Sequence, residues 1–163
     1  MSELFAPPGN DWRPVSGALA RMRRTVLAGA LVALAVAAVV VVLALDVPLW
    51  VLIAALVVLL LAGGWGWWLI GRNARYWGYA ERDEDLYIKH GALYRRLVAV
   101  PYGRMQYVDV TAGPLEQAYG IATVHLHTAS PHTSARIPGL PRDEAARLRD
   151  RLTSLGEAQA AGL

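Results

Sequence analysis

The chain has 163 residues, of which 55% are hydrophobic, and its mean hydropathy is +0.32. That hydropathy is high for a soluble domain of this length and indicates that part of the chain lies in a membrane. The sequence contains no cysteine, which excludes disulfides and thiolate metal sites. The formal net charge is only +3, and the arginines gather beside the apolar stretch, so a nucleic-acid-binding protein is disfavoured.

The chain begins with a polar segment. Residues 1–14 contain three prolines and a glycine, a composition typical of a mobile arm. In residues 15–24, Val15, Leu19 and Met22 follow helical spacing with arginines between them. Two interpretations remain open for this stretch: a short interfacial helix that feeds the first span, or simply the cytoplasmic end of that span. We expect residues 1–24 to form a cytoplasmic N-terminal arm and interfacial helix.

Two uncharged apolar runs follow, residues 25–45 and 49–71. At 1.5 Å per residue, the first run is roughly 30 Å long, the thickness of a bilayer core. Only residues 46–48 separate the runs, so we expect an antiparallel transmembrane hairpin over residues 25–71. A buried hairpin in a soluble protein is disfavoured because no other helices could cover it. A cleaved signal peptide is disfavoured because a second span follows at once.

Arginines flank the hairpin at one end only. Four precede the first run, two follow the second, and the connecting turn contains only Asp46. The positive-inside rule therefore predicts that both termini are cytoplasmic. Tryptophans near the ends of the second run fit an aromatic belt. The predicted membrane-interface anchors are Trp50, Trp65, Trp67, Trp68, Arg21, Arg23, Arg24, Arg72 and Arg75. Three glycines would let a neighbouring helix approach closely: Gly63, Gly64 and Gly66.

After residue 71 the pattern changes from helix to strand, and we expect one domain over residues 72–156. Alternating apolar and polar residues, separated by glycine and proline, predict six strands. They are residues 76–81, 85–90, 93–100, 104–112, 121–129 and 133–140. A helical turn is expected over residues 114–120. The last helix, residues 140–156, ends at Gly156 and leaves residues 157–163 as a tail. Its apolar stripe consists of Ala145, Leu148, Leu152 and Leu155.

Several short strands and one closing helix, directly after a two-helix hairpin, make a specific order. In this order the sequence resembles the YdbS-like family of bacterial membrane-flanked pleckstrin-homology (PH) domains. The residues that carry the resemblance are Pro101, "RMQYVDV" (104–110), "GPL" (113–115), "GIATVHLHTA" (120–129) and "IPGLP" (137–141). The resemblance implies an α+β membrane protein with a bent antiparallel β-barrel capped by the C-terminal helix. Family members often carry a basic residue where this chain has "EQAY" (116–119), so a contact made by that residue is in doubt here.

The sequence does not predict catalysis or a cofactor. No serine lies in a nucleophile elbow and no glycine-rich loop has phosphate-binding spacing. His125 and His127 share one face of a strand and, with His132, could contribute to a zinc site. We favour the simpler interpretation of polar residues on a solvated strand face, because no carboxylate lies at suggestive spacing. We therefore expect a protein that is not an enzyme and holds no metal.

The charge pattern bears on lipid binding. Eukaryotic PH domains often bind phosphoinositides around the loop between their first two strands, which we take here to be "ERDED", residues 81–85. Its four carboxylates would repel a phosphate headgroup, so we expect no phosphoinositide binding at that loop. Arg95, Arg96 and Arg104 could form a patch for anionic lipid or a partner. The alternative is a solvated barrel face. Tyr94, Tyr102, Tyr107 and Tyr119 could mark a protein-binding face, although half-buried barrel positions would equally explain most of them.

The sequence thus favours a non-enzymatic, membrane-anchored interaction module in a bacterial plasma membrane. Its partner would be a larger membrane protein with several similar domains, as the resemblance implies, or a second copy of the chain. The alternative is a sensor of lipid or a small ligand at the cytoplasmic membrane face. The residues we expect at the contact with a partner or lipid are Arg95, Arg96, Arg104, Gln106 and Tyr107.

Overall fold

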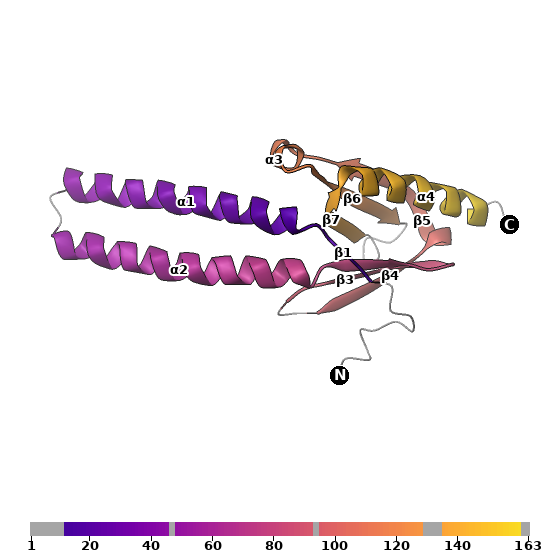
Figure 1. The fold of residues 1–163 in the computed structure, drawn as a ribbon, viewed down its shortest axis with the longest axis horizontal. Helices are drawn as coiled ribbons and strands as arrows, with labels where there is room; N and C mark the ends of the chain where they lie inside the picture. The colour runs from indigo at the N-terminus through magenta and orange to yellow at the C-terminus, as the bar shows by residue number, and fades with distance from the viewer. Residues whose placement is uncertain (1–11, 46–47, 93–94, 129–134, 161–163) are drawn as a thin grey trace. The chain divides into compact units, whose positions relative to one another are not determined.

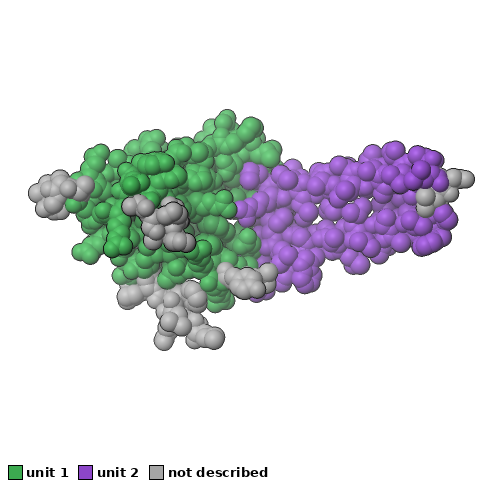
Figure 2. Space-filling model, turned by 180° about the vertical axis from the view of Figure 1, so that it is seen from behind, with its two compact units in different colours: residues 1–19, 73–163 green, residues 20–72 purple. Residues whose placement is uncertain are grey.

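The computed structural model describes residues 12–45, 48–92, 95–128 and 135–160. Its contacts divide the chain into two compact units, drawn in different colours in Figure 2. One unit is residues 20–72, which contain most of the two long helices. The other joins the described residues up to Leu19 with those from Asn73 onward. Residues on both sides of the helices in the sequence therefore build the same domain.

The unit of residues 20–72 is the helical hairpin. Helix α1 runs over Gly17–Ala44 and α2 over Leu49–Arg75 (Figure 1). Each is long and apolar enough to cross a membrane, with a mean hydropathy of 3.1 and 2.3 over its most apolar window. At most 6% of either window is buried by protein, so these apolar side chains require lipid around them. The prediction of a transmembrane hairpin is confirmed.

Two of the three predicted glycines lie where the helices approach each other. A Cβ atom on Gly63 would lie 2.7 Å from Leu31 Cδ1, and one on Gly66 would lie 3.2 Å from Leu27 Cδ2. Both leucines belong to α1, so these glycines of α2 make room for its side chains. Gly64 faces open space within 4 Å and takes no part in this packing.

The other unit contains two antiparallel sheets. The first has the order β1-β2-β3-β4 and the second the order β5-β6-β7. The strands are β1 (Arg13–Pro14), β2 (Gly78–Glu81), β3 (Asp85–His90), β4 (Arg96–Pro101), β5 (Met105–Thr111), β6 (Ile121–Thr128) and β7 (Ala135–Pro141). Short helices η2 (Tyr102–Arg104) and α3 (Pro114–Ala118) flank β5, and α4 (Arg142–Ala160) closes the chain (Figure 1). This is the α+β, PH-like arrangement that the sequence predicts.

The first strand lies before the hairpin in the sequence. Arg13 pairs with Tyr79 and Pro14 with Gly78 of β2, so the membrane hairpin is inserted between the first two strands of the domain. The next turn is also part of the domain, because Leu19 is 1% exposed and the Ser16 amide donates to the Gly139 carbonyl at 2.9 Å. Residues 13 and 14 were expected to belong to a mobile arm, but they form a strand of the domain. A two-residue strand shows no alternation, so its sequence could not reveal it.

The core fills the space between the sheets and α4. Alternate positions of the strands point inward, as at Leu86 and Ile88 of β3 and at Val124 and Leu126 of β6. Helix α4 packs on the second sheet and on η2. Three residues of its predicted apolar stripe are fully buried, namely Ala145, Leu148 and Leu152, and the fourth, Leu155, is half-buried.

Helix α4 does not end at Gly156 as expected. It continues to Ala160, so residues 157–160 of the predicted tail are helical. A glycine inside a helix costs only about 1 kcal/mol relative to alanine. The helix still has a surface to cover beyond that point: Gly156 lies over the Tyr102 carbonyl, and Gln159 lies beside Gly103. Tertiary contact with η2 therefore overrides the local stop signal.

Candidate functional site

The five predicted contact residues separate into two groups. Arg104 lies in η2, and Gln106 and Tyr107 follow it on β5. Arg95 and Arg96 lie at the opposite end of β4. The six residues of β4 span roughly 20 Å at a rise of about 3.3 Å per residue. The three arginines therefore do not share one patch, because the strand between them runs away from one end of the sheet toward the other.

Gln106 and Tyr107 line a groove between β5 and α4. The groove has a volume of about 310 Å³, and its walls are Met105, Gln106, Tyr107, Val108, Leu152, Thr153, Gly156 and Glu157. The Tyr107 side chain is 58% exposed, and its ring stacks on His127 with centroids 4.2 Å apart. Strand β5 stands at the edge of its sheet. An edge strand beside a groove can pair with an extended segment of another chain.

Arg96 lines a second hollow, which we call the basic cavity. It has a volume of about 390 Å³ and lies between the ends of β3 and β4 on one side and β6 and β7 on the other. Its lining is Trp77, Ile88, His90, Arg96, Val98, His125, Leu126, His127, Ala135 and Arg136. In the strand register, Arg96 lies opposite His90, and Arg136 lies opposite His125. The Trp77 ring stacks on the His90 ring with centroids 4.8 Å apart.

A smaller recess of about 320 Å³ adjoins the basic cavity and shares His90 and Arg96 with it. Its other lining residues are Arg75, Tyr76, Lys89, Gly91 and Arg95. The Arg95 guanidinium lies over the Tyr76 ring, 5.4 Å from its centroid. Burial lowers the pKa of Lys89, and burial together with the charges of Arg96 and Arg136 lowers the pKa of His90 below its ordinary 6.5. His90 is therefore neutral at neutral pH.

From the sequence, the acidic loop "ERDED" was expected to join the first two strands of the domain. That expectation is wrong. The loop connects β2 with β3, because the true first strand lies before the hairpin. Glu81 is also not free to repel a ligand, since its side chain is only 10% exposed and pairs with arginines. The carboxylates of this loop therefore do not bear on lipid binding at the opposite end of β3, where the basic cavity lies.

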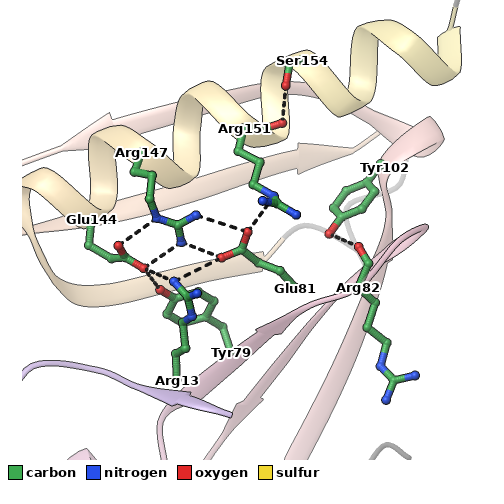
Figure 3. Close-up of polar contacts among 9 residues, drawn as sticks. All are labelled: Arg13, Tyr79, Glu81, Arg82, Tyr102, Glu144, Arg147, Arg151 and Ser154. Atoms are coloured by element: carbon green, nitrogen blue, oxygen red, sulfur yellow. Dashed lines mark hydrogen bonds and ion pairs between the residues drawn. The ribbon is translucent and has the colours of Figure 1, made fainter. Parts of the chain in front are cut away.

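An ion-pair cluster fastens the N-terminal strand to the domain (Figure 3). Arg147 of α4 donates from Nη2 to Glu81 Oε1 at 2.6 Å and to Glu144 Oε1 at 2.8 Å. Arg13 of β1 donates to Glu144 Oε1 at 3.1 Å, and Tyr79 also donates its hydroxyl proton to that oxygen. Arg151 Nε lies 2.9 Å from Glu81 Oε2. The network thus joins β1, which precedes the hairpin, to β2 and α4, which follow it.

The cluster lowers the pKa of Glu144 and raises the pKa of Tyr79, Arg13 and Arg147. The hydrogen bond from Arg147 holds the pKa of Glu144 at about 2, with further lowering by Tyr79 and Arg13 and an opposing effect of burial. Burial, together with the bond to Glu144, raises the pKa of Tyr79 to about 12. Both groups therefore keep the protonation states that the network needs across the physiological range.

Because the pKa of Glu144 is lower in the folded protein than the ordinary 4.5, its contribution to stability is fully present above pH 4.5. That contribution disappears as the pH falls from 4.5 toward 2, and it amounts to at most about 3 kcal/mol. We expect urea titrations of the detergent-solubilised chain to show this decline. The Glu144→Gln variant should lose less stability over the same pH interval, and an equal loss in both proteins would contradict the assignment.

Within the described ranges, no group of three or more His, Asp or Glu side chains is placed to hold a metal ion. His125 and His127 are half-exposed on β6, and His125 Nε2 lies 3.1 Å from Thr111 Oγ1. Three residues that were singled out from the sequence lie outside the described residues: Asp46, Tyr94 and His132.

The predicted membrane anchors lie near the ends of the hairpin helices. The Arg24 guanidinium lies 4.9 Å from the Trp67 ring centroid, and that of Arg72 lies 5.2 Å from Trp68. Trp65 contacts Trp68 at a centroid distance of 5.7 Å. Arginines stacked on tryptophans suit the headgroup region, where an apolar ring and a charged group are both solvated. Trp50 is at the other end of α2 and is exposed; Arg75, in the last turn of α2, lines the recess described above.

Comparison with known proteins agrees with this fold. A family model described as "Bacterial PH domain" matches residues 24–155. The "UPF0699 transmembrane protein YdbS" of Bacillus subtilis (strain 168) is 38% identical to this chain over 81 residues. The aligned stretch covers 50% of each protein, so the match extends over about half the length of that relative. No solved structure matches the chain.

Proposed function

This chain belongs to the bacterial PH domain family, and on that premise we propose that it is a non-enzymatic interaction module of the bacterial membrane. The hairpin anchors the domain, and the domain docks on a second membrane protein that carries similar domains, or on a second copy of the chain. We further propose that both termini and the domain lie in the cytoplasm, because the arginines flank the open end of the hairpin.

The groove between β5 and α4 carries this proposal. It combines an edge strand, whose outward N–H and C=O groups can pair with another chain, and a 58% exposed aromatic ring at Tyr107. Tyrosine is enriched at the centres of protein interfaces because it contributes a large, rigid contact area. Arg104, at the start of β5, would add a charged contact at the edge of the same interface.

Attachment to the membrane favours such a contact. The two helices confine the domain to one membrane face, which raises its concentration toward other proteins in that membrane. The insertion of the hairpin between β1 and β2 means that both helices connect directly to the domain. Weak contacts in the groove can therefore support a stable complex without a large interface.

We expect a photo-crosslinking amino acid at Tyr107 to capture a membrane-anchored partner in native membranes, seen as one discrete product. Mass spectrometry of that product should identify a protein with similar domains or the chain itself. The matched control is the same amino acid at Asp150, which is exposed on α4 outside the groove. Equal products from both positions, or none from Tyr107, would contradict the groove as the docking site.

A further inference from the structure

The basic cavity and the groove have no lining residue in common. The proposed docking of a partner in the groove therefore does not explain the basic cavity. Its two arginines come from different sheets, Arg96 from β4 and Arg136 from β7. Within the described residues, neither has a carboxylate within ion-pair distance. Both charges nonetheless lie close enough to His90 to lower its pKa. Two guanidinium groups therefore line one hollow, and no carboxylate of the described residues forms an ion pair with either.

The charges of strand β3 are divided between its two ends. Strand β3 begins beside Asp83, Glu84 and Asp85 and ends at Lys89 and His90. The two connections at the basic end, residues 91–95 and 129–134, contain no aspartate or glutamate in their sequence. No acidic residue in these connections can therefore neutralise Arg96 and Arg136. This separation raises the local concentration of anions at the cavity.

The size and lining of the cavity suit a phosphate group. A volume of about 390 Å³ exceeds what one phosphate needs and leaves room for the group that it esterifies. Guanidinium groups bind phosphate oxygens through paired N–H donors in a planar fork. His90, stacked on Trp77, can donate a further hydrogen bond from its ring. The adjoining recess adds Arg75, Lys89 and Arg95 as surrounding positive charge.

We propose that the basic cavity binds a phosphate group through Arg96 and Arg136, with His90 as a third contact. This proposal is independent of the partner proposed above. The phosphate can belong to a soluble phosphate ester or to the headgroup of an anionic phospholipid. Two residues separate the end of α2 from the start of β2, and Gly78, the first residue of β2, pairs with Lys89 at the basic end of β3.

Binding should depend on pH through His90. The Trp77 ring stacks on the His90 ring. The titratable and charged residues that line the basic cavity with His90 are Arg96 of β4, Arg136 of β7, and His125 and His127 of β6. Those that line the adjoining recess with it are Arg75, Tyr76, Lys89, Arg95 and Arg96. A bound phosphate offsets the two arginine charges and favours the protonated ring. Phosphate should therefore raise the pH at which His90 titrates, and phosphate should bind more tightly as the pH falls through that range.

The test follows the ring signals of His90 by NMR in the full-length chain, labelled at its four histidines. The chain is titrated in neutral detergent with inorganic phosphate or glycerol 3-phosphate, against chloride at equal ionic strength. It is also placed in phosphatidylcholine nanodiscs with and without phosphatidylglycerol. We expect at least one phosphate source to raise the titration midpoint of His90 by about half a pH unit or more.

Two variants of equal charge localise the effect. Arg96→Gln with Arg136→Gln removes the proposed ligands and should abolish the shift. Each lost arginine should weaken phosphate binding about tenfold or more. Arg142→Gln with Arg149→Gln removes two exposed arginines of α4 outside the cavity and should preserve the shift. Near-ultraviolet circular dichroism verifies that both variants are folded. If either variant fails to fold, the titration of the wild-type chain still tests the proposal.

The outcomes are distinct. A shift with soluble phosphates identifies a soluble ligand, and a shift only with phosphatidylglycerol identifies a lipid headgroup; both support the site. The absence of a shift from every source in the wild-type chain overturns the proposal. An equal loss of the shift in both double variants also overturns it, because the effect would then follow net charge and not the cavity. Crosslinking from Tyr107 is unaffected by any of these results.

Discussion

Replacing Gly139 with alanine should destabilise the domain by about 3 kcal/mol, from backbone strain and steric conflict together. Gly139 has φ of +74°, a conformation that an L-amino acid with a Cβ atom adopts at a cost. Its new Cβ atom would also lie 2.7 Å from Leu19 Cβ and 3.1 Å from Leu19 Cγ. Because Leu19 is buried and its Cβ is fixed to the backbone of α1, the helix start would have to move away.

The measurement is a urea titration of the full-length chain in mild detergent, followed by near-ultraviolet circular dichroism. Hydrogen exchange gives a local second readout, because the Ser16 amide donates to the Gly139 carbonyl and should lose its protection. The matched control is Gly120→Ala. Gly120 has φ of +67° but no atom within 4 Å of the new Cβ, so it should cost only about 1–2 kcal/mol from strain. Equal losses in the two variants would show that Leu19 does not pack there.

Replacing Glu81 with glutamine should cost about 2–3 kcal/mol. The side chain is 10% exposed and pairs with Arg147 at 2.6 Å and Arg151 at 2.9 Å, with Arg13 at 3.8 Å. Glutamine keeps the size of the side chain but removes its charge. Arg13 and Arg147 would then share the single carboxylate of Glu144, and Arg151 would lose its ion pair with Glu81. The repulsion among the three guanidinium groups would loosen β1 and α4 from β2.

The same urea titration measures this loss, and Asp150→Asn provides the control. Asp150 pairs with Arg149 at 2.7 Å, but its side chain is 68% exposed, so water and salt screen the interaction. Its loss should change the free energy of unfolding by less than about 0.5 kcal/mol. If Glu81→Gln proved as mild as Asp150→Asn, the cluster would be a surface feature without a role in holding the N-terminal strand.

Some regions of this protein could be predicted because their signal is local. Twenty consecutive uncharged residues can only be stabilised in lipid, so the hairpin follows from the sequence alone. The alternation in residues 85–90 and 121–129 predicted strands that match β3 and β6 closely, since one face of each strand is buried. The stripe Ala145, Leu148 and Leu152 likewise identified the buried face of α4.

The candidate sites were only partly predictable. Gln106 and Tyr107 were singled out from the sequence, but the groove that they line also needs α4, which is distant in the chain. Arg96 was singled out as well, whereas Arg136 was not, because only the pairing of β6 with β7 brings it to the basic cavity. The sequence around an arginine at the end of a strand does not reveal whether its side chain lines a cavity or is solvated.

The sequence by itself determined the membrane hairpin, the order of the later strands and the closing helix, because each depends on residues that are neighbours along the chain. The tertiary structure alone decided that β1 precedes the hairpin, that α4 continues past Gly156, and that the acidic loop follows the second strand. These features depend on contacts between residues far apart in the sequence, such as Arg13 with Glu144 and Leu19 with Gly139. Two residues of strand and one turn of helix are too short to show periodicity, so only their burial against the rest of the domain reveals them.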